Sequence, residues 1–252
     1  MVGSPGAGVA RAESMRVVKR SATAQLADVE RRVVACERCP ELRSYCAEVG
    51  RAKRRAYRDH DYWARPVAGF GDPTARVVLV GLAPGAHGSN RTGRPFTGDA
   101  SGDWLYRALH RAGFANQPQS VDRADGMRLH DCWISSAVRC APPGNKPTPA
   151  QRDACAPYLT EELAALSGVR VIVTLGRFAD DAVHAHVRAT GSLVGVRTPF
   201  AHLAESQVDL PDSRGVTVLA SYHPSRQNTQ TGVLTAAMLD AVFVRARALL
   251  GD

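Results

Sequence analysis

The sequence predicts an α/β fold, a three-layer α/β/α sandwich in which helices cover both faces of a central, mostly parallel sheet. Two observations predict it. Four short runs are apolar almost throughout and rich in β-branched residues, and helical segments alternate with them. The runs span residues 76–82, 132–138, 169–175 and 215–221. Such runs are typical of strands buried on both faces of a parallel sheet.

Helices are expected between and around these strands, at residues 21–36, 101–112, 148–166, 176–187 and 231–250. The first carries Leu26, Val29 and Val33 at helical spacing, which places them on one face. The third opens with Thr148 and Gln151 in a capping-box arrangement, with proline at the first helical position. The alternation of strand and helix therefore accounts for most of the chain.

Residues 1–20 are rich in Gly, Ala, Ser and Pro and are expected to form a disordered tail, ahead of a single domain at residues 21–252. The tail lacks the apolar core of a secretory signal. No apolar run approaches the roughly 20 residues of a membrane span. We therefore expect a cytoplasmic protein without a membrane partner, most simply a monomer. The net charge of +8 suits a polyanionic partner, although charge alone is weak support.

Six cysteines in a reducing compartment suggest metal binding or catalysis more than disulfides. Cys36 and Cys39 form a C-x2-C pair, and Cys140 and Cys155 form a C-x14-C pair much later in the chain. Four thiolates suit a tetrahedral zinc or a [4Fe–4S] cluster, and the spacing does not choose between them. The proline after Cys39 favours a cluster. Cys132 lies inside a predicted strand and is expected to be a buried apolar group.

Three loops follow predicted strands, at residues 81–99, 139–145 and 222–225. Ligands of such sheets bind outside the carboxyl ends of the strands, so we expect the loops to converge on one cleft. The first loop holds five glycines and two arginines in nineteen residues, but matches neither a P-loop nor a dinucleotide-binding motif. Phe96 in this loop is either a core residue or a stacking platform for a planar ring.

Histidines divide into those near the predicted cleft and those elsewhere. His223 follows a strand directly and precedes a proline, so a rigid turn would aim its imidazole into the cleft; a structural, hydrogen-bonded histidine is the alternative. His184 and His186 lie on a predicted helix and are expected to face solvent. The basic run at residues 51–58 is interpreted as a solvated loop, with a further set of phosphate contacts as the alternative.

Taken together, the two cysteine pairs and residues 81–85, 91–99, 139–145 and 223–225 resemble the iron–sulfur members of the uracil-DNA glycosylase superfamily, most closely family 5, or type b. The resemblance covers the chain from Cys36 to its end. It implies a base-excision repair enzyme that hydrolyses the N-glycosidic bond of uracil, and of other deaminated bases such as hypoxanthine, in double-stranded DNA. It also implies that the four paired cysteines hold a [4Fe–4S] cluster.

The resemblance further implies a base pocket in which Phe96 stacks on the flipped base and His223 lies over its carbonyl edge. The pocket residues implied in this way are Gly81, Leu82, Ala83, Pro84, Gly85, Phe96 and Ser136. Two of them depart from family 4. Leu82 stands where family 4 has a water-orienting glutamate, and Ser136 stands where family 4 has an asparagine that reads uracil. Both departures resemble family 5, which accepts a wider set of bases.

A mechanism follows as a hypothesis. The target nucleotide must leave the duplex, and its glycosidic bond then breaks with oxocarbenium character on the sugar. A hydrogen-bond donor at the base carbonyl would stabilise the developing negative charge, and His223 is the candidate. Asp99 and Asn90 are candidates for holding water, although Asp99 could instead cap the helix that follows. The expected DNA contacts are Arg91, Arg94, Ser225, Arg226 and Gln227.

Two other functions remain open at this point. A non-catalytic iron–sulfur DNA-binding module would keep the charge and the cysteines, but would leave Phe96 and the turn at His223 unexplained. A zinc-stabilised hydrolase of free nucleotides would share the pocket but not the DNA contacts.

Overall fold

The computed structural model describes residues 20–251. The predicted tail, residues 1–20, lies outside the described residues except for Arg20. The helices are α1 (Ala22–Val34), α2 (Pro40–Ala52), α3 (Ser89–Thr92), α4 (Ala100–Arg111), α5 (Pro149–Ala165), α6 (Arg177–Thr190), α7 (Arg226–Gln230) and α8 (Ala236–Leu250), with 3-10 turns η1 (Arg55–Tyr57) and η2 (Pro143–Asn145). The strands are β1 (Phe70–Gly71), β2 (Val77–Gly81), β3 (Cys132–Ser136), β4 (Val171–Leu175), β5 (Ser192–Val194), β6 (Glu205–Asp209) and β7 (Gly215–Ser221).

The seven strands form one sheet in the order β1-β3-β2-β4-β7-β6-β5. The central strands β3, β2, β4 and β7 run parallel to one another. The outer strands pair antiparallel: β1 with β3 at one edge, and β6 with β7 and β5 with β6 toward the other edge. Every residue of β2, β3 and β4 is buried, as the apolar runs predicted. The predicted α/β fold with a mostly parallel sheet is confirmed.

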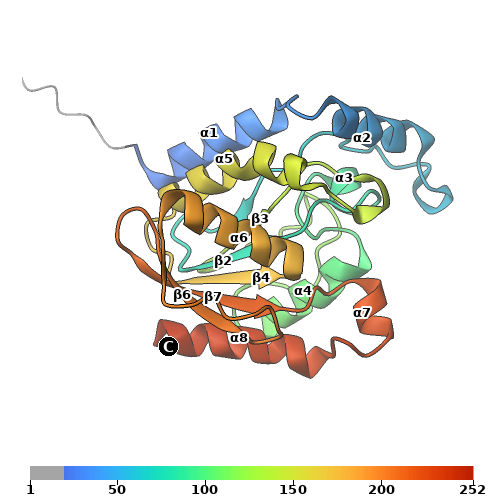
Figure 1. The fold of residues 1–252 in the computed structure, drawn as a ribbon. Coiled ribbons are helices and arrows are strands. Elements are labelled where there is room, and N and C mark those ends of the chain that lie inside the picture. The colour runs from blue at the N-terminus through green and yellow to red at the C-terminus, as the bar shows by residue number, and fades with distance from the viewer. Residues whose placement is uncertain (1–19, 252) are drawn as a thin grey trace, which may run out of the picture.

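Helices cover both faces of the sheet (Figure 1). On one face, Val77 and Leu79 of β2 belong to a core shared with α4 and α8. On the other face, Val78 and Val80 pack in a core with residues of α1, α5 and α6. Successive strand residues point to opposite faces, so a single strand contributes to both cores. None of the described helices combines the length and the apolar character that crossing a bilayer requires.

Helix boundaries follow the local signals closely. The capping box of α5 is present, because Thr148 accepts from the Gln151 backbone and the Gln151 side chain accepts from the Thr148 backbone. The last predicted helix begins later than expected. Thr235 caps it at Met238, and the shorter α7 precedes it. The basic run at residues 51–58 is mostly exposed, as expected, at the end of α2 and in η1.

The prediction that His184 and His186 face solvent is wrong. Both side chains are buried in the described structure. His184 Nδ1 lies 2.9 Å from the carbonyl oxygen of Asp180, and His186 Nδ1 lies 3.0 Å from Thr160 Oγ1. The face of α6 that carries them packs inward, and Nδ1 of each ring has a partner, from the preceding turn of α6 or from α5. Nε2 of His184 is buried without a hydrogen-bond partner among the described residues.

Candidate active site

The loops after the central parallel strands meet at the carboxyl ends of those strands. The start of the first loop is joined to the segment between β3 and the second loop by backbone hydrogen bonds, from Ala137 N to Gly81 O at 2.9 Å and from Val138 N to Leu82 O at 3.1 Å. The ends of β4 and β7 are joined by a bond of 2.8 Å from Gly176 N to Ser221 O. The expected convergence of the three loops is therefore present in the structure.

Phe96 lies at the centre of this edge. Its side chain is 9% exposed, and its φ of 51° places the backbone in the left-handed region. The ring lies against Gly81, where an added Cβ would come within 2.8 Å of Cε2 and Cζ. Its centroid is 5.9 Å from that of His223, with the two ring planes inclined by 32°. Phe96 therefore packs as a core residue beside Gly81 and His223, and its role as a stacking platform stays a prediction.

His223 is held at the end of β7 by its backbone. Asn228 Nδ2 donates to the His223 carbonyl at 2.8 Å, and an added Cβ on Gly176 would lie 3.2 Å from the His223 Cβ. Burial lowers the pKa of His223 to about 4, so the imidazole is neutral at pH 7 and carries one N–H. Neither ring nitrogen bonds to another residue within 20–251, which leaves the N–H free to meet a ligand.

Asp99 serves as the N-cap of α4, since its Oδ1 accepts from Gly102 N at 3.0 Å. Its Oδ2 faces the glycine-rich loop. An added Cβ on Gly85 would lie 3.0 Å from that oxygen, and one on Gly88 would collide with it. Burial raises the pKa of Asp99. Both expected roles are thus compatible, because one oxygen caps the helix and the other borders the loop.

Asn90 lies deeper than expected for a water-holding residue. It is fully buried, and its Nδ2 is 3.4 Å from the carbonyl oxygens of both Cys46 and Ala86. Its Oδ1 has no hydrogen-bond partner among the described residues. The side chain therefore ties the glycine-rich loop to α2 from behind.

The remaining predicted pocket residues line the same edge. Leu82, Ala83 and Gly85 are partly exposed, whereas Pro84 is buried. Ser136 is 8% exposed and pairs with Gly81 in the parallel register of β2 and β3. The short serine side chain therefore sits next to the glycine against which Phe96 packs.

The arginines expected to contact DNA fall into two groups. Arg91 and Arg94 are buried, at 7% and 5% exposure. Arg91 donates to the carbonyls of His87 and Gly98, each at 2.8 Å. Arg226 and Gln227 are exposed on α7, and Ser225 caps that helix at Asn228 N. The structure thus turns Arg91 and Arg94 toward the protein, which does not support direct phosphate contacts by them.

The four paired cysteines lie in one region, close enough to influence one another. Burial, followed by the charge of Cys155, raises the pKa of Cys39, and burial raises the pKa of Cys155. A hydrogen bond with Cys46 raises the pKa of Cys140. All six cysteines are free, and no three metal-ligating side chains within residues 20–251 converge tightly enough for a single ion. Cys132 is fully buried in β3, as expected.

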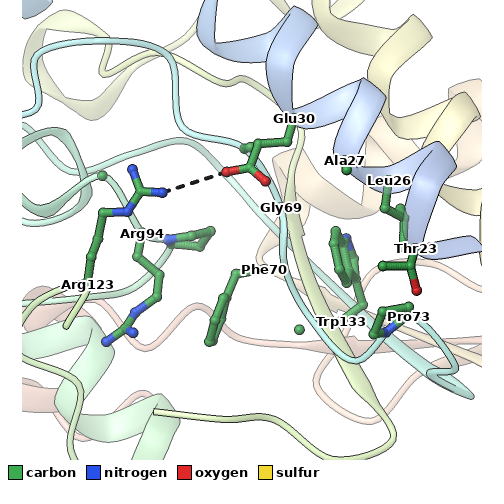
Figure 2. Close-up of a pocket in the computed structure, with 14 residues that line it drawn as sticks. Thr23, Leu26, Ala27, Glu30, Gly69, Phe70, Pro73, Arg94, Arg123 and Trp133 are labelled. Carbon is green, nitrogen blue, oxygen red and sulfur yellow. Dashed lines mark ion pairs between the residues drawn. The ribbon is translucent and has the colours of Figure 1, made fainter. Parts of the chain in front are cut away.

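A cavity of about 310 Å³ lies elsewhere, at the sheet edge formed by β1 (Figure 2). Phe70 and Trp133 form part of its wall, and Arg123 and Glu30 form an ion pair of 3.6 Å across its rim. Gly93, Arg94 and Pro95 also line it, but neither Phe96 nor His223 does. This cavity is therefore behind the segment that carries Phe96 and is separate from the predicted base pocket.

Sequence reasoning missed a buried ion pair between Arg139 and Glu162, whose side chains lie 2.7 Å apart and are almost fully buried. Ser135 Oγ donates to the same carboxylate at 2.6 Å. The pair joins the second loop to α5. The signal that could have found it is a glutamate between apolar residues on the buried face of a helix, because such a charge requires a partner.

Comparison with known proteins agrees with this arrangement. The family model described as the uracil DNA glycosylase superfamily matches residues 68–247. The chain is 52% identical to the type-5 uracil-DNA glycosylase of Thermus thermophilus over 87% of this chain and 95% of that protein. It is 48% identical to that of Mycobacterium tuberculosis, over 87% and 80%. It is 32% identical to the type-4 enzyme of Archaeoglobus fulgidus, over 61% of each. The chain belongs to the uracil DNA glycosylase superfamily.

Proposed function

We propose that the protein is a uracil-DNA glycosylase of base-excision repair, which hydrolyses the N-glycosidic bond between a deaminated base and its deoxyribose. The observation that carries the proposal is the pair formed by Phe96 and His223. An aromatic ring and a neutral imidazole lie 5.9 Å apart at the carboxyl end of the parallel strands. The type-5 relatives named above support the same activity.

The pocket suits a base that has left the duplex. A flipped base costs a few kcal/mol to expose, and stacking on Phe96 recovers part of that cost. As the glycosidic bond breaks, negative charge develops on the base, and the N–H of His223 donates to its carbonyl oxygen. Backbone N–H groups of the 82–85 loop assist. Because the pKa of His223 is about 4, the ring is neutral at pH 7 and acts as a hydrogen-bond donor, not as a cation.

If the glycosidic bond breaks well before water attacks the sugar, no strong base is needed to activate the water. Leu82 has no group that could orient water. Asp99 is the better candidate for holding the attacking water. Its Oδ2 faces the glycine-rich loop, and the hydrogen bond from Gly102 N to Oδ1 fixes the orientation of the carboxyl group. Asn90 supports the same loop from inside through the carbonyls of Cys46 and Ala86.

We propose double-stranded DNA with deaminated bases as the substrate, hypoxanthine included. Ser136 offers a short hydroxyl that donates or accepts, so it does not impose the fixed donor–acceptor pattern of an asparagine. Arg226 and Gln227 are exposed on α7, next to His223, and are suited to phosphate contacts. We expect the enzyme to act as a monomer.

We further propose that Cys36, Cys39, Cys140 and Cys155 hold a [4Fe–4S] cluster. A cubane cluster separates its thiolates more widely than one metal ion does, which suits four cysteines that share a region without converging on a point. Raised thiol pKa values mean that the thiolates need a cationic group to stabilise them. A bound cluster would crosslink the start of α2, the loop after β3 and α5. We propose a cytoplasmic location, where thiols stay reduced.

The test is single-turnover cleavage of labelled duplexes that differ at one pair, G·U, G·T or G·I, read as alkali-sensitive strand breaks. Breaks at uracil but not at thymine support the proposal, and breaks at inosine support the wider base range. A folded, iron-containing protein that binds these duplexes without breaking any would favour the binding module instead.

A further inference from the structure

Arg94 lies two residues before Phe96, and its guanidinium is directed into the protein. The side chain is 5% exposed. Its Nε donates to Thr97 Oγ1 at 3.1 Å, and its NH2 donates to Ser120 Oγ at 2.7 Å and to Asp125 Oδ2 at 2.6 Å. The same nitrogen reaches the carbonyl of Asp122. One arginine therefore joins the active-site loop to the distant segment 120–125.

Asp125 is the other half of this connection. Its side chain is 6% exposed, and besides Arg94 it accepts from Val121 N at 2.7 Å and Met127 N at 2.9 Å. These backbone bonds fix the conformation of the segment around it. A buried carboxylate with several donors is a rigid anchor, because every alternative arrangement leaves a buried charge unsatisfied.

Phe96 needs such an anchor. Its φ of 51° is unfavourable for a bulky residue, so the surrounding structure must impose it. Both neighbours are held in place. Pro95 O accepts from Tyr106 OH at 3.0 Å, and Thr97 Oγ1 lies 2.7 Å from Ser120 Oγ. Gly98 N donates to Ser120 O at 2.9 Å.

We infer that Arg94 is a positioning residue, which holds Phe96 in its strained conformation as the base platform through Asp125 and the 120–125 segment. This inference rests on the proposed function, since it assigns a support to the same pocket. It replaces the phosphate contact that the sequence suggested for Arg94. The two roles make opposite predictions for DNA binding and for the rate of bond breaking.

The experiment compares the wild-type holoenzyme with Arg94→Met, Arg94→Lys and the double variant Arg94→Met/Asp125→Asn. The lysine keeps the charge but cannot reproduce the fork geometry. The double variant avoids leaving Asp125 buried and unpaired, so it keeps the inference testable if Arg94→Met folds poorly. Arg111→Met removes an ion pair with Asp240 between α4 and α8 and serves as a control for a structural loss away from the pocket.

Three quantities are measured for each protein. They are the single-turnover rate at saturating enzyme on a G·U duplex, the affinity for undamaged duplex as a function of salt, and the fluorescence of 2-aminopurine beside a non-cleavable 2′-fluoro-deoxyuridine. The last reports the flipped base directly. Arg226→Met is the comparison for a phosphate contact, for which affinity and the salt slope are expected to fall.

For a positioning role, the Arg94 variants lose on the order of 10- to 100-fold in single-turnover rate and lose the flipped-base fluorescence. Their affinity for undamaged duplex and its salt slope stay as in the wild type, and Arg111→Met keeps the wild-type rate. A lower salt slope with an unchanged rate would overturn the inference in favour of a phosphate contact. Unchanged rate and fluorescence would overturn it as well. A wild-type enzyme that cleaves no duplex would instead contradict the proposed function.

Discussion

The predicted base pocket and the cysteine region both lie toward the carboxyl ends of the parallel strands but are built differently. In the predicted pocket, Phe96 lies against Gly81 and His223 against Gly176, and the lack of a Cβ at both glycines allows the close approach. In the cysteine region, thiols from the start of α2, the loop after β3 and α5 lie near one another, and Cys140 shares a hydrogen bond with Cys46 of α2. The residues of the predicted pocket are thus positioned by the folded chain, whereas the proposed cluster would crosslink the segments of the cysteine region.

The largest effect is expected from His223→Ala. Loss of the N–H donor should lower the single-turnover rate on a G·U duplex on the order of 10²- to 10³-fold. Because the backbone of His223 is held by Asn228 and Gly176, the thermal unfolding midpoint should change little. A variant that cleaves at a near-normal rate would contradict the role of His223 and the claim that the pocket is preorganised around it.

Gly81→Ala tests whether close backbone approach places the aromatic platform. The added Cβ would lie 2.8 Å from the Phe96 ring and must displace it. We expect a loss on the order of 10- to 100-fold in single-turnover rate. Gly215→Ala is the matched control, because a Cβ there meets nothing closer than Asp209 Oδ1 at 3.9 Å. Equal rates for the two variants would show that Phe96 tolerates displacement.

Cys155→Ala tests the other side of the comparison. We expect loss of the iron and of its visible absorbance, and a fall in the thermal unfolding midpoint, because binding of the cluster to the native state no longer stabilises it. Cys132→Ala should keep its iron, since Cys132 lies within β3. Full iron content in Cys155→Ala, measured by metal analysis, would remove that residue from the ligand set.

The smallest effect concerns pH. The folded pKa of His223 is about 4, below the ordinary value of 6.5, so the unfolded chain binds its proton first as pH falls. The contribution of His223 to the free energy of unfolding is fully present above pH 6.5. It falls as the pH drops toward 4, and the total loss is about 1–3 kcal/mol. Urea unfolding at pH 7.5 and 4.5 should therefore show a larger loss in wild type than in His223→Gln.

Asp99 provides the internal check on that measurement. Its pKa is raised by burial, so its contribution to stability changes with pH in the opposite direction. It is present in both proteins, and the difference between them therefore isolates His223. Equal pH dependence in wild type and variant would mean that the imidazole is not desolvated in the folded protein.

Much of the fold could be predicted because its signals are local. The four central strands are apolar runs, and the capping box of α5 lies within four residues. The outer, antiparallel strands could not be predicted in the same way. β6 carries mostly polar residues and β1 has only two residues, so their pairing depends on β7 and β3 and not on their own composition.

The candidate site divides in the same way. The sequence by itself determined which residue types follow the parallel strands, and topology then brought Phe96 and His223 to one edge. Only the tertiary structure decided the fate of the charged and titratable groups. Arg94 can be buried because it forms an ion pair with Asp125, and His186 can be buried because it shares a hydrogen bond with Thr160. Partners so distant in the chain leave no local pattern, since burial of a polar group depends on what the fold places against it.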